Sequence, residues 1–191
     1  MSLFYKLAIL MGLVVVLSNY LVQFPIQYFG LSDILTYGAF SYPVTFLITD
    51  LANRAYGKLV ARKIVYVGFF VGICLTLLVS TNFSDLISVR IAIGSGVAFF
   101  IAQNLDVGIF DIFRKKVWYV APLTSSVFGS IVDTFLFFSI SFYATGVPWL
   151  SLAAGDLFVK LFIALSMLIP FRLLLSSIRD ISDDRFKKKL M

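Results

Sequence analysis

A carboxylate and a guanidinium lie four residues apart in the apolar stretch Tyr42–Gly57. At this spacing Asp50 and Arg54 share one face of a helix and can form an ion pair. Ionisable side chains inside apolar helices are costly, and they usually face a bundle interior or a water-filled cavity. The pattern therefore indicates either a structural ion pair or a helix that lines a solute site. We expect the solute site, because Asn53 adds a further polar group nearby.

A second carboxylate lies deep in another apolar stretch. Asp133 is surrounded on its helical stripe by small residues, among them Ser126 and Gly129. A lone carboxylate at such a depth must be paired or must line water. We therefore expect Asp133 to be functional.

Two further pairs of polar residues have helical spacing. Asp156 and Lys160 are four apart and can either neutralise each other or reach the surface. Gln103 and Asp106 are one turn apart, and they either line the solute path or cap a helix near a basic loop. The candidate substrate-binding residues are Asn19, Asp50, Asn53, Arg54, Gln103, Asp106, Ser126, Asp133, Asp156 and Lys160.

The elements that must position these residues are membrane helices. Hydrophobic residues make up 60% of the 191 residues, and the mean hydropathy is +0.98, well above the level of a soluble domain. Spans of about 20 apolar residues cross a bilayer. The sequence predicts an all-α membrane protein, with residues 1–191 forming a single integral membrane domain of six transmembrane helices at about 7–21, 40–56, 64–80, 86–110, 118–143 and 152–175.

The basic residues predict the orientation of these helices. Of the 16 Lys and Arg residues, 13 fall in alternate connections and at the two termini. Because cytoplasmic loops are rich in Lys and Arg, we expect both termini to be cytoplasmic. The net charge of +6 thus indicates contact with membrane lipid and no nucleic-acid partner. The spacing of Gly68 and Gly72 permits a homodimer.

Several classes of chemistry are absent from the sequence. The chain has one cysteine and no histidine, which excludes internal disulfides, zinc clusters and Ser-His or Cys-His catalysis. It also lacks a Walker A loop and a G-x-S-x-G motif. We expect no enzyme activity, no metal and no cofactor.

Taken together, the polar blocks resemble those of the queuosine precursor transporters, a vitamin-uptake family of bacterial inner-membrane proteins. The resemblance covers most of the chain, and it rests on five blocks: S-N-Y-L-V-Q-F-P at Ser18–Pro25, P-V-T-F-L-I-T-D-L-A-N-R-A-Y-G at Pro43–Gly57, A-Q-N-L-D-V at Ala102–Val107, W-Y-V-A-P-L-T-S-S-V-F-G-S-I-V-D-T at Trp118–Thr134 and G-D-L-F-V-K at Gly155–Lys160. It implies a multi-pass importer of 7-cyano- or 7-aminomethyl-7-deazaguanine for tRNA modification. It also implies a fold similar to the substrate-binding S-components of energy-coupling-factor transporters.

A deazaguanine has a donor edge, a carbonyl acceptor and a flat apolar face. A carboxylate can accept both donors, and an amide or a guanidinium can meet the carbonyl. The residues leave the choice open: Asp50, Asp106 or Asp133 for the donors, and Asn19, Gln103 or Arg54 for the acceptors. Proton coupling and facilitated entry followed by metabolic trapping are both open. The alternatives are a substrate-capture subunit for another vitamin that works with a separate ATPase, and an assembly protein that binds no small molecule.

Overall fold

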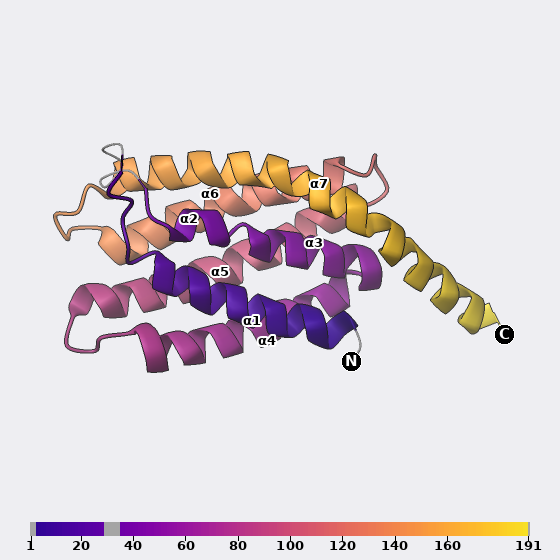
Figure 1. The fold of residues 1–191 in the computed structure, drawn as a ribbon, viewed down its shortest axis with the longest axis horizontal. Helices are drawn as coiled ribbons and strands as arrows, with labels where there is room; N and C mark the ends of the chain where they lie inside the picture. The colour runs from indigo at the N-terminus through magenta and orange to yellow at the C-terminus, as the bar shows by residue number, and fades with distance from the viewer. Residues whose placement is uncertain (1–2, 29–34, 191) are drawn as a thin grey trace.

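The computed structural model describes residues 3–28 and 35–190. Regular structure in this part of the chain is helical, apart from one antiparallel bridge between Pro25 and Thr36. The helices run along one long axis, as Figure 1 shows. They are α1 (Leu3–Leu21), α2 (Gly38–Ser41), α3 (Val44–Tyr56), α4 (Lys58–Leu75), the π-helical turn η1 (Thr76–Ser80), α5 (Leu86–Phe113), α6 (Val120–Phe142) and α7 (Trp149–Leu190). The predicted all-α class is confirmed.

Five segments are long and apolar enough to cross a membrane. They are Phe4–Leu21, Lys58–Leu78, Leu86–Phe113, Val120–Phe142 and Trp149–Ser176, and they coincide with five of the six predicted spans. The remaining prediction, about 40–56, falls on α2 and α3. With 13 residues, α3 is only about 20 Å long, whereas the hydrocarbon core of a bilayer is about 30 Å thick.

The helix predicted at about 40–56 is interrupted near its start. Pro43 has no N–H group and cannot donate to the carbonyl of Ala39, four residues earlier. Instead, both the backbone N–H and the hydroxyl of Thr45 donate to the carbonyl of Tyr42, at 2.9 and 2.7 Å. The helix therefore breaks after Ser41 and restarts at Val44. The break leaves Tyr42 at the junction of the two pieces.

A single residue separates α3 from α4. Gly57 has φ of +89°, a conformation that favours glycine because it lacks a Cβ. Its N–H donates to the Asn53 carbonyl at 2.8 Å, and its own carbonyl accepts from Ala61 at 3.0 Å. The basic residues after Gly57, predicted to lie in a connection, are thus the first turns of α4. The predicted charged tail is likewise helical, since α7 continues to Leu190.

The two ends of the bundle differ in charge. Both termini and the α3–α4 and α5–α6 connections lie at one end (Figure 1). This end carries Lys58 and the run Arg114–Lys116, and we call it the basic end. The connections α1–α2, η1–α5 and α6–α7 lie at the opposite end (Figure 1).

Small residues bring α1 and α4 into close contact. A Cβ added at Gly72 would lie 2.5 Å from Cγ1 of Val15, and one added at Gly68 would overlap Met11. Both glycines are buried against α1. This pair therefore packs two helices of the same chain.

We expect Gly72→Leu to lower the free energy of unfolding in detergent by about 1–3 kcal/mol, because the added side chain overpacks the α1–α4 contact. Gly108→Leu is the matched control, since a Cβ at Gly108 meets nothing within 4 Å. Thermal unfolding of the two variants measures the effect. Equal melting temperatures would contradict the α1–α4 packing described here.

Candidate functional site

A buried lysine lies between two aspartates in the half of the bundle away from the basic end. Lys160 Nζ on α7 is 2.5 Å from Asp156 Oδ2 and 2.8 Å from Asp133 Oδ2 on α6. Their side chains are at most 7% exposed. Of the two alternatives left open for Asp156 and Lys160, the structure shows the i, i+4 ion pair, and this pair is buried. Two carboxylates and one ammonium leave this group one net negative charge when all three are ionised.

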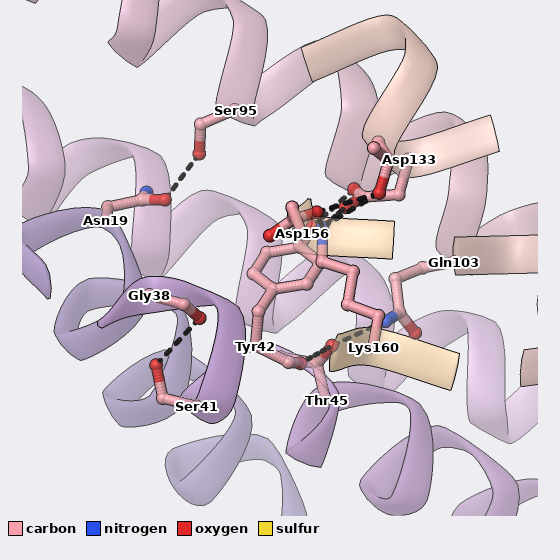
Figure 2. A network of polar contacts seen from close by, with 11 residues as sticks. Asn19, Gly38, Ser41, Tyr42, Thr45, Ser95, Gln103, Asp133, Asp156 and Lys160 are labelled. Atoms are coloured by element: carbon pink, nitrogen blue, oxygen red, sulfur yellow. Dashed lines mark hydrogen bonds and ion pairs between the residues drawn. The ribbon is translucent and has the colours of Figure 1, made fainter. Parts of the chain in front are cut away.

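Two hydroxyl groups complete the cluster. Tyr42 donates its hydroxyl to Asp133 Oδ1 at 2.8 Å, and Thr134 donates to Asp156 Oδ2 at 2.8 Å. Lys160 Nζ also lies 4.9 Å from the centre of the Tyr42 ring, within range of a cation–π interaction. Figure 2 shows Tyr42, Asp133, Asp156 and Lys160 converging on one point. We call these four residues and Thr134 the Lys160 cluster.

A pocket lies beside the Lys160 cluster. The space between its lining atoms is about 340 Å³, and this figure includes space open to the outside. Most of its lining side chains are polar or charged, with the apolar side chains of Val22 and Phe137 among them. Its lining residues are Ser18, Asn19, Val22, Gly38, Tyr42, Ser95, Asp133, Phe137, Asp156 and Lys160. We call it the polar pocket.

Asn19 lies in the wall of the polar pocket and connects three elements. Its Nδ2 donates to Thr76 Oγ1 at 2.8 Å, and its Oδ1 accepts from Ser95 Oγ at 2.6 Å. A side-chain amide has two donor hydrogens and two acceptor lone pairs. One donor and one acceptor position of Asn19 therefore remain for a ligand.

A second polar group lies deeper in the bundle. Asp50 on α3 accepts from Ser125 Oγ at 3.1 Å and from Ser126 Oγ at 3.4 Å, both on α6. Asp106 on α5 interacts with Asp50 and with the Ser125 hydroxyl, but neither of its carboxylate oxygens makes a hydrogen bond of normal geometry. Both aspartates are almost fully buried. We call them the acid pair.

A separate, narrow pocket reaches Asp50 from the α7 side. It lies between α3, α6 and α7 and is lined by Asp50 and Ser126 among apolar residues. The effective cost of burying an ionised carboxylate is several kcal/mol. Placing two of them together without a basic partner therefore requires a compensating positive charge.

The ion pair between Asp50 and Arg54 that their spacing allowed does not form. The carboxylate of Asp50 contacts α6, whereas Arg54 Nη1 donates to the backbone carbonyl of Arg114 at 2.9 Å. Arg114 in turn donates to the carbonyls of Asn53 and Arg54. Arg114 is the C-cap of α5, and the carbonyls at a helix end lack intrahelical partners, so its carbonyl is available to the Arg54 guanidinium. Arg54 ties α3 to the basic end, and it does not line either pocket.

Gln103 and Asn53 hold α5 against α3. The Gln103 amide donates to Thr45 Oγ1 at 2.8 Å and accepts from Thr49 Oγ1 at 2.5 Å. Asn53 Nδ2 donates to the Val107 carbonyl at 3.0 Å. Neither side chain lines the polar pocket. The structure thus divides the ten candidates: Asn19, Asp133, Asp156 and Lys160 line the polar pocket, and Asp50, Ser126 and Asp106 form the deeper group.

Sequence reasoning missed Tyr42 and Thr134 as site residues. Tyr42 stands directly before Pro43, and a tyrosine at a proline break places its hydroxyl at an irregular point of the helix. The position of Tyr42 next to Pro43 was therefore the feature of the sequence that could have identified it. Thr134 follows Asp133 in the sequence, and it points to α7 because its hydroxyl reaches Asp156. No local pattern distinguishes it from the other hydroxyl residues of α6.

The polar pocket combines complementary groups. Asp133 and Asp156 are acceptors, Lys160 is a donor, and the rings of Tyr42 and Phe137 provide apolar faces. Such a set suits a flat ligand that carries both donors and an acceptor. Within residues 3–28 and 35–190, no group of three or more Asp, Glu, Cys or His side chains is placed to hold a metal ion.

We expect Lys160→Met to lower the free energy of unfolding by about 3–5 kcal/mol, because it leaves two buried carboxylates without a cation. Lys115→Met, at an exposed position of the α5–α6 connection, is the control and should change stability little. Thermal unfolding of the ligand-free protein in detergent measures both variants. Similar melting temperatures for the two would show that Lys160 does not neutralise a buried cluster.

The sequence has relatives among characterised families. Three similar proteins are a probable queuosine precursor transporter of Haemophilus influenzae (36% identical; 82% of this chain and 79% of the relative covered), the queuosine precursor transporter of Escherichia coli (33%; 83% and 79%) and a probable queuosine precursor transporter of Bacillus subtilis (30%; 92% and 84%). No solved structure matches the chain significantly. Residues 36–175, which include most of the residues around both pockets, match the family model described as "Putative vitamin uptake transporter". The chain therefore belongs to this vitamin uptake transporter family.

Proposed function

We propose that this protein imports a queuosine precursor, 7-cyano-7-deazaguanine or 7-aminomethyl-7-deazaguanine, and binds it in the polar pocket. The observation that carries the proposal is the Lys160 cluster, a buried set of paired acceptors and one donor in the wall of a pocket. The names of the three relatives support the substrate class.

The chemistry of the pocket complements a deazaguanine. Its ring N–H and amino group can both donate to one carboxylate, here Asp133, in a bidentate arrangement. Lys160, which already lies 2.8 Å from Asp133, can turn to the ring carbonyl. Tyr42 and Phe137 are placed to contact the flat face. Lys160 contacts the Asp133 oxygen that one of the ligand's donors would reach.

The proposal includes an orientation in the bacterial inner membrane. The positive-inside rule puts the basic end and both termini in the cytoplasm. The polar pocket lies in the other half of the bundle, so it faces the side from which an importer collects its substrate. We propose that α2 and α3 together form the sixth span. A discontinuous helix at the substrate site is a recurrent feature of secondary transporters.

We expect Asp133→Asn to weaken precursor binding by about 2 kcal/mol or more, roughly 30-fold. The amide keeps one acceptor oxygen but loses the charge and the second acceptor. The measurement is a titration of purified protein with 7-cyano-7-deazaguanine, followed by the rise in melting temperature that binding to the folded state produces. Guanine and common vitamins serve as comparison ligands.

Asp111→Asn is the matched control, because Asp111 is partly exposed and pairs with Arg114 at the basic end. Wild-type binding by both variants would remove Asp133 from the site. Absence of precursor binding by the wild-type protein would overturn the proposed function. Uptake into liposomes that contain only this protein separates an importer from a substrate-capture subunit, which would require an ATPase partner.

A further inference from the structure

The acid pair is a group that the proposed substrate site does not use. The nearest basic side chains are engaged elsewhere: Lys160 contacts Asp133 and Asp156, and Arg54 donates to the Arg114 carbonyl. The α7 residues in the pocket beside Asp50 are apolar. Among the described residues, the groups that act on Asp50 are Asp106, Ser125 and Ser126.

Asp106 has unused oxygen atoms. Neither of its carboxylate oxygens makes a hydrogen bond of normal geometry, although the hydroxyl of Ser125, which donates to Asp50, also interacts with Asp106. Asp106 is fully buried. Buried polar atoms are nearly always satisfied in proteins. Two buried carboxylates that interact with each other, with no basic partner among the described residues, require a positive species.

We propose that Asp50 and Asp106 form a cation site, which takes up one proton or one sodium ion, and that its occupancy is coupled to import. A proton would bind to one carboxyl oxygen and be shared with the neighbouring carboxylate. A sodium ion would be held by the same carboxylate oxygens. The coupling part of the proposal rests on the proposed function.

The two sites are connected through α6 and the α2–α3 segment. Tyr42, at the junction of α2 and α3, contacts Asp133 of α6, and Asp50 of α3 contacts Ser125 and Ser126 of α6. A shift of the α2–α3 segment against α6 that accompanies precursor binding would therefore alter the acid pair as well. Coupling between two sites requires such a shared element, whose position both ligands affect.

The test uses the full chain in liposomes with the membrane potential held at zero. A tenfold inward proton or sodium gradient is imposed separately, and accumulated 7-cyano-7-deazaguanine is measured. For one cation per substrate, we expect up to about tenfold accumulation with the gradient of the coupled cation. Asp106→Asn should reduce the ratio of uptake with and without that gradient to about one. Asp111→Asn, the same substitution on the same helix, should keep the wild-type ratio.

A second measurement does not depend on the precursor. The melting temperature of the ligand-free protein should change with sodium concentration if sodium binds. If a proton binds, it should change with pH by an amount that is smaller in Asp106→Asn. Accumulation with the proton gradient alone or with the sodium gradient alone identifies the cation.

Precursor binding without any gradient effect in the wild-type protein would overturn the cation site and leave the proposed function intact. Absence of precursor binding would overturn the proposed function itself.

Discussion

The structure depends on the neutralisation of buried charge by Lys160. Its ammonium group contacts Asp133 and Asp156 at hydrogen-bond distance, in a part of the bundle with little access to water. Removing one member would leave an uncompensated buried charge, so the cluster constrains α6, α7 and the α2–α3 junction together. An apolar core would hold three helices without this risk. The charges are therefore better explained by a ligand that needs them than by stability.

The interrupted α2–α3 segment connects the two polar groups of the bundle. Tyr42 at its break contacts the Lys160 cluster, and Asp50, two turns further along α3, belongs to the acid pair. The segment is short because Pro43 interrupts it at one end and Gly57 reverses the chain at the other. Its polar side chains contact α5 and α6 through Gln103, Ser125 and Ser126. Any movement of this segment would alter both groups.

Local sequence patterns predicted some of these contacts and not others. The spacing of four residues allowed an ion pair in two places, and the pair forms for Asp156 and Lys160 but not for Asp50 and Arg54. Such spacing places two side chains on one face, but competing partners decide the outcome. Arg54 donates to the Arg114 carbonyl at the end of α5, whereas Asp50 faces the serines of α6. The contact of Lys160 with Asp133 joins residues 27 positions apart, and no periodicity within one helix predicts it.

The energetic cost of burying charge predicted the polar residues of the bundle interior better than the spacing of residues along one helix. Five charged residues were selected as candidates because they lie within apolar stretches, and all five are buried in polar groups: Asp50, Asp106, Asp133, Asp156 and Lys160. Tyr42 escaped this reasoning because a tyrosine is tolerated in any membrane helix. The five long helices followed from hydropathy. The break before Pro43 did not, since a proline near a helix start is normally compatible with an unbroken helix.

The central claim is that the polar pocket, with Asp133 at its wall, holds the substrate. A structure of the protein determined with bound 7-cyano-7-deazaguanine tests it most directly. The account predicts a planar ligand in the polar pocket, its donor edge on the Asp133 carboxylate and its face against Tyr42 or Phe137, with Lys160 turned toward the ring carbonyl. A ligand bound beside Asp50 and Asp106, with the Lys160–Asp133 contact unchanged, would contradict it.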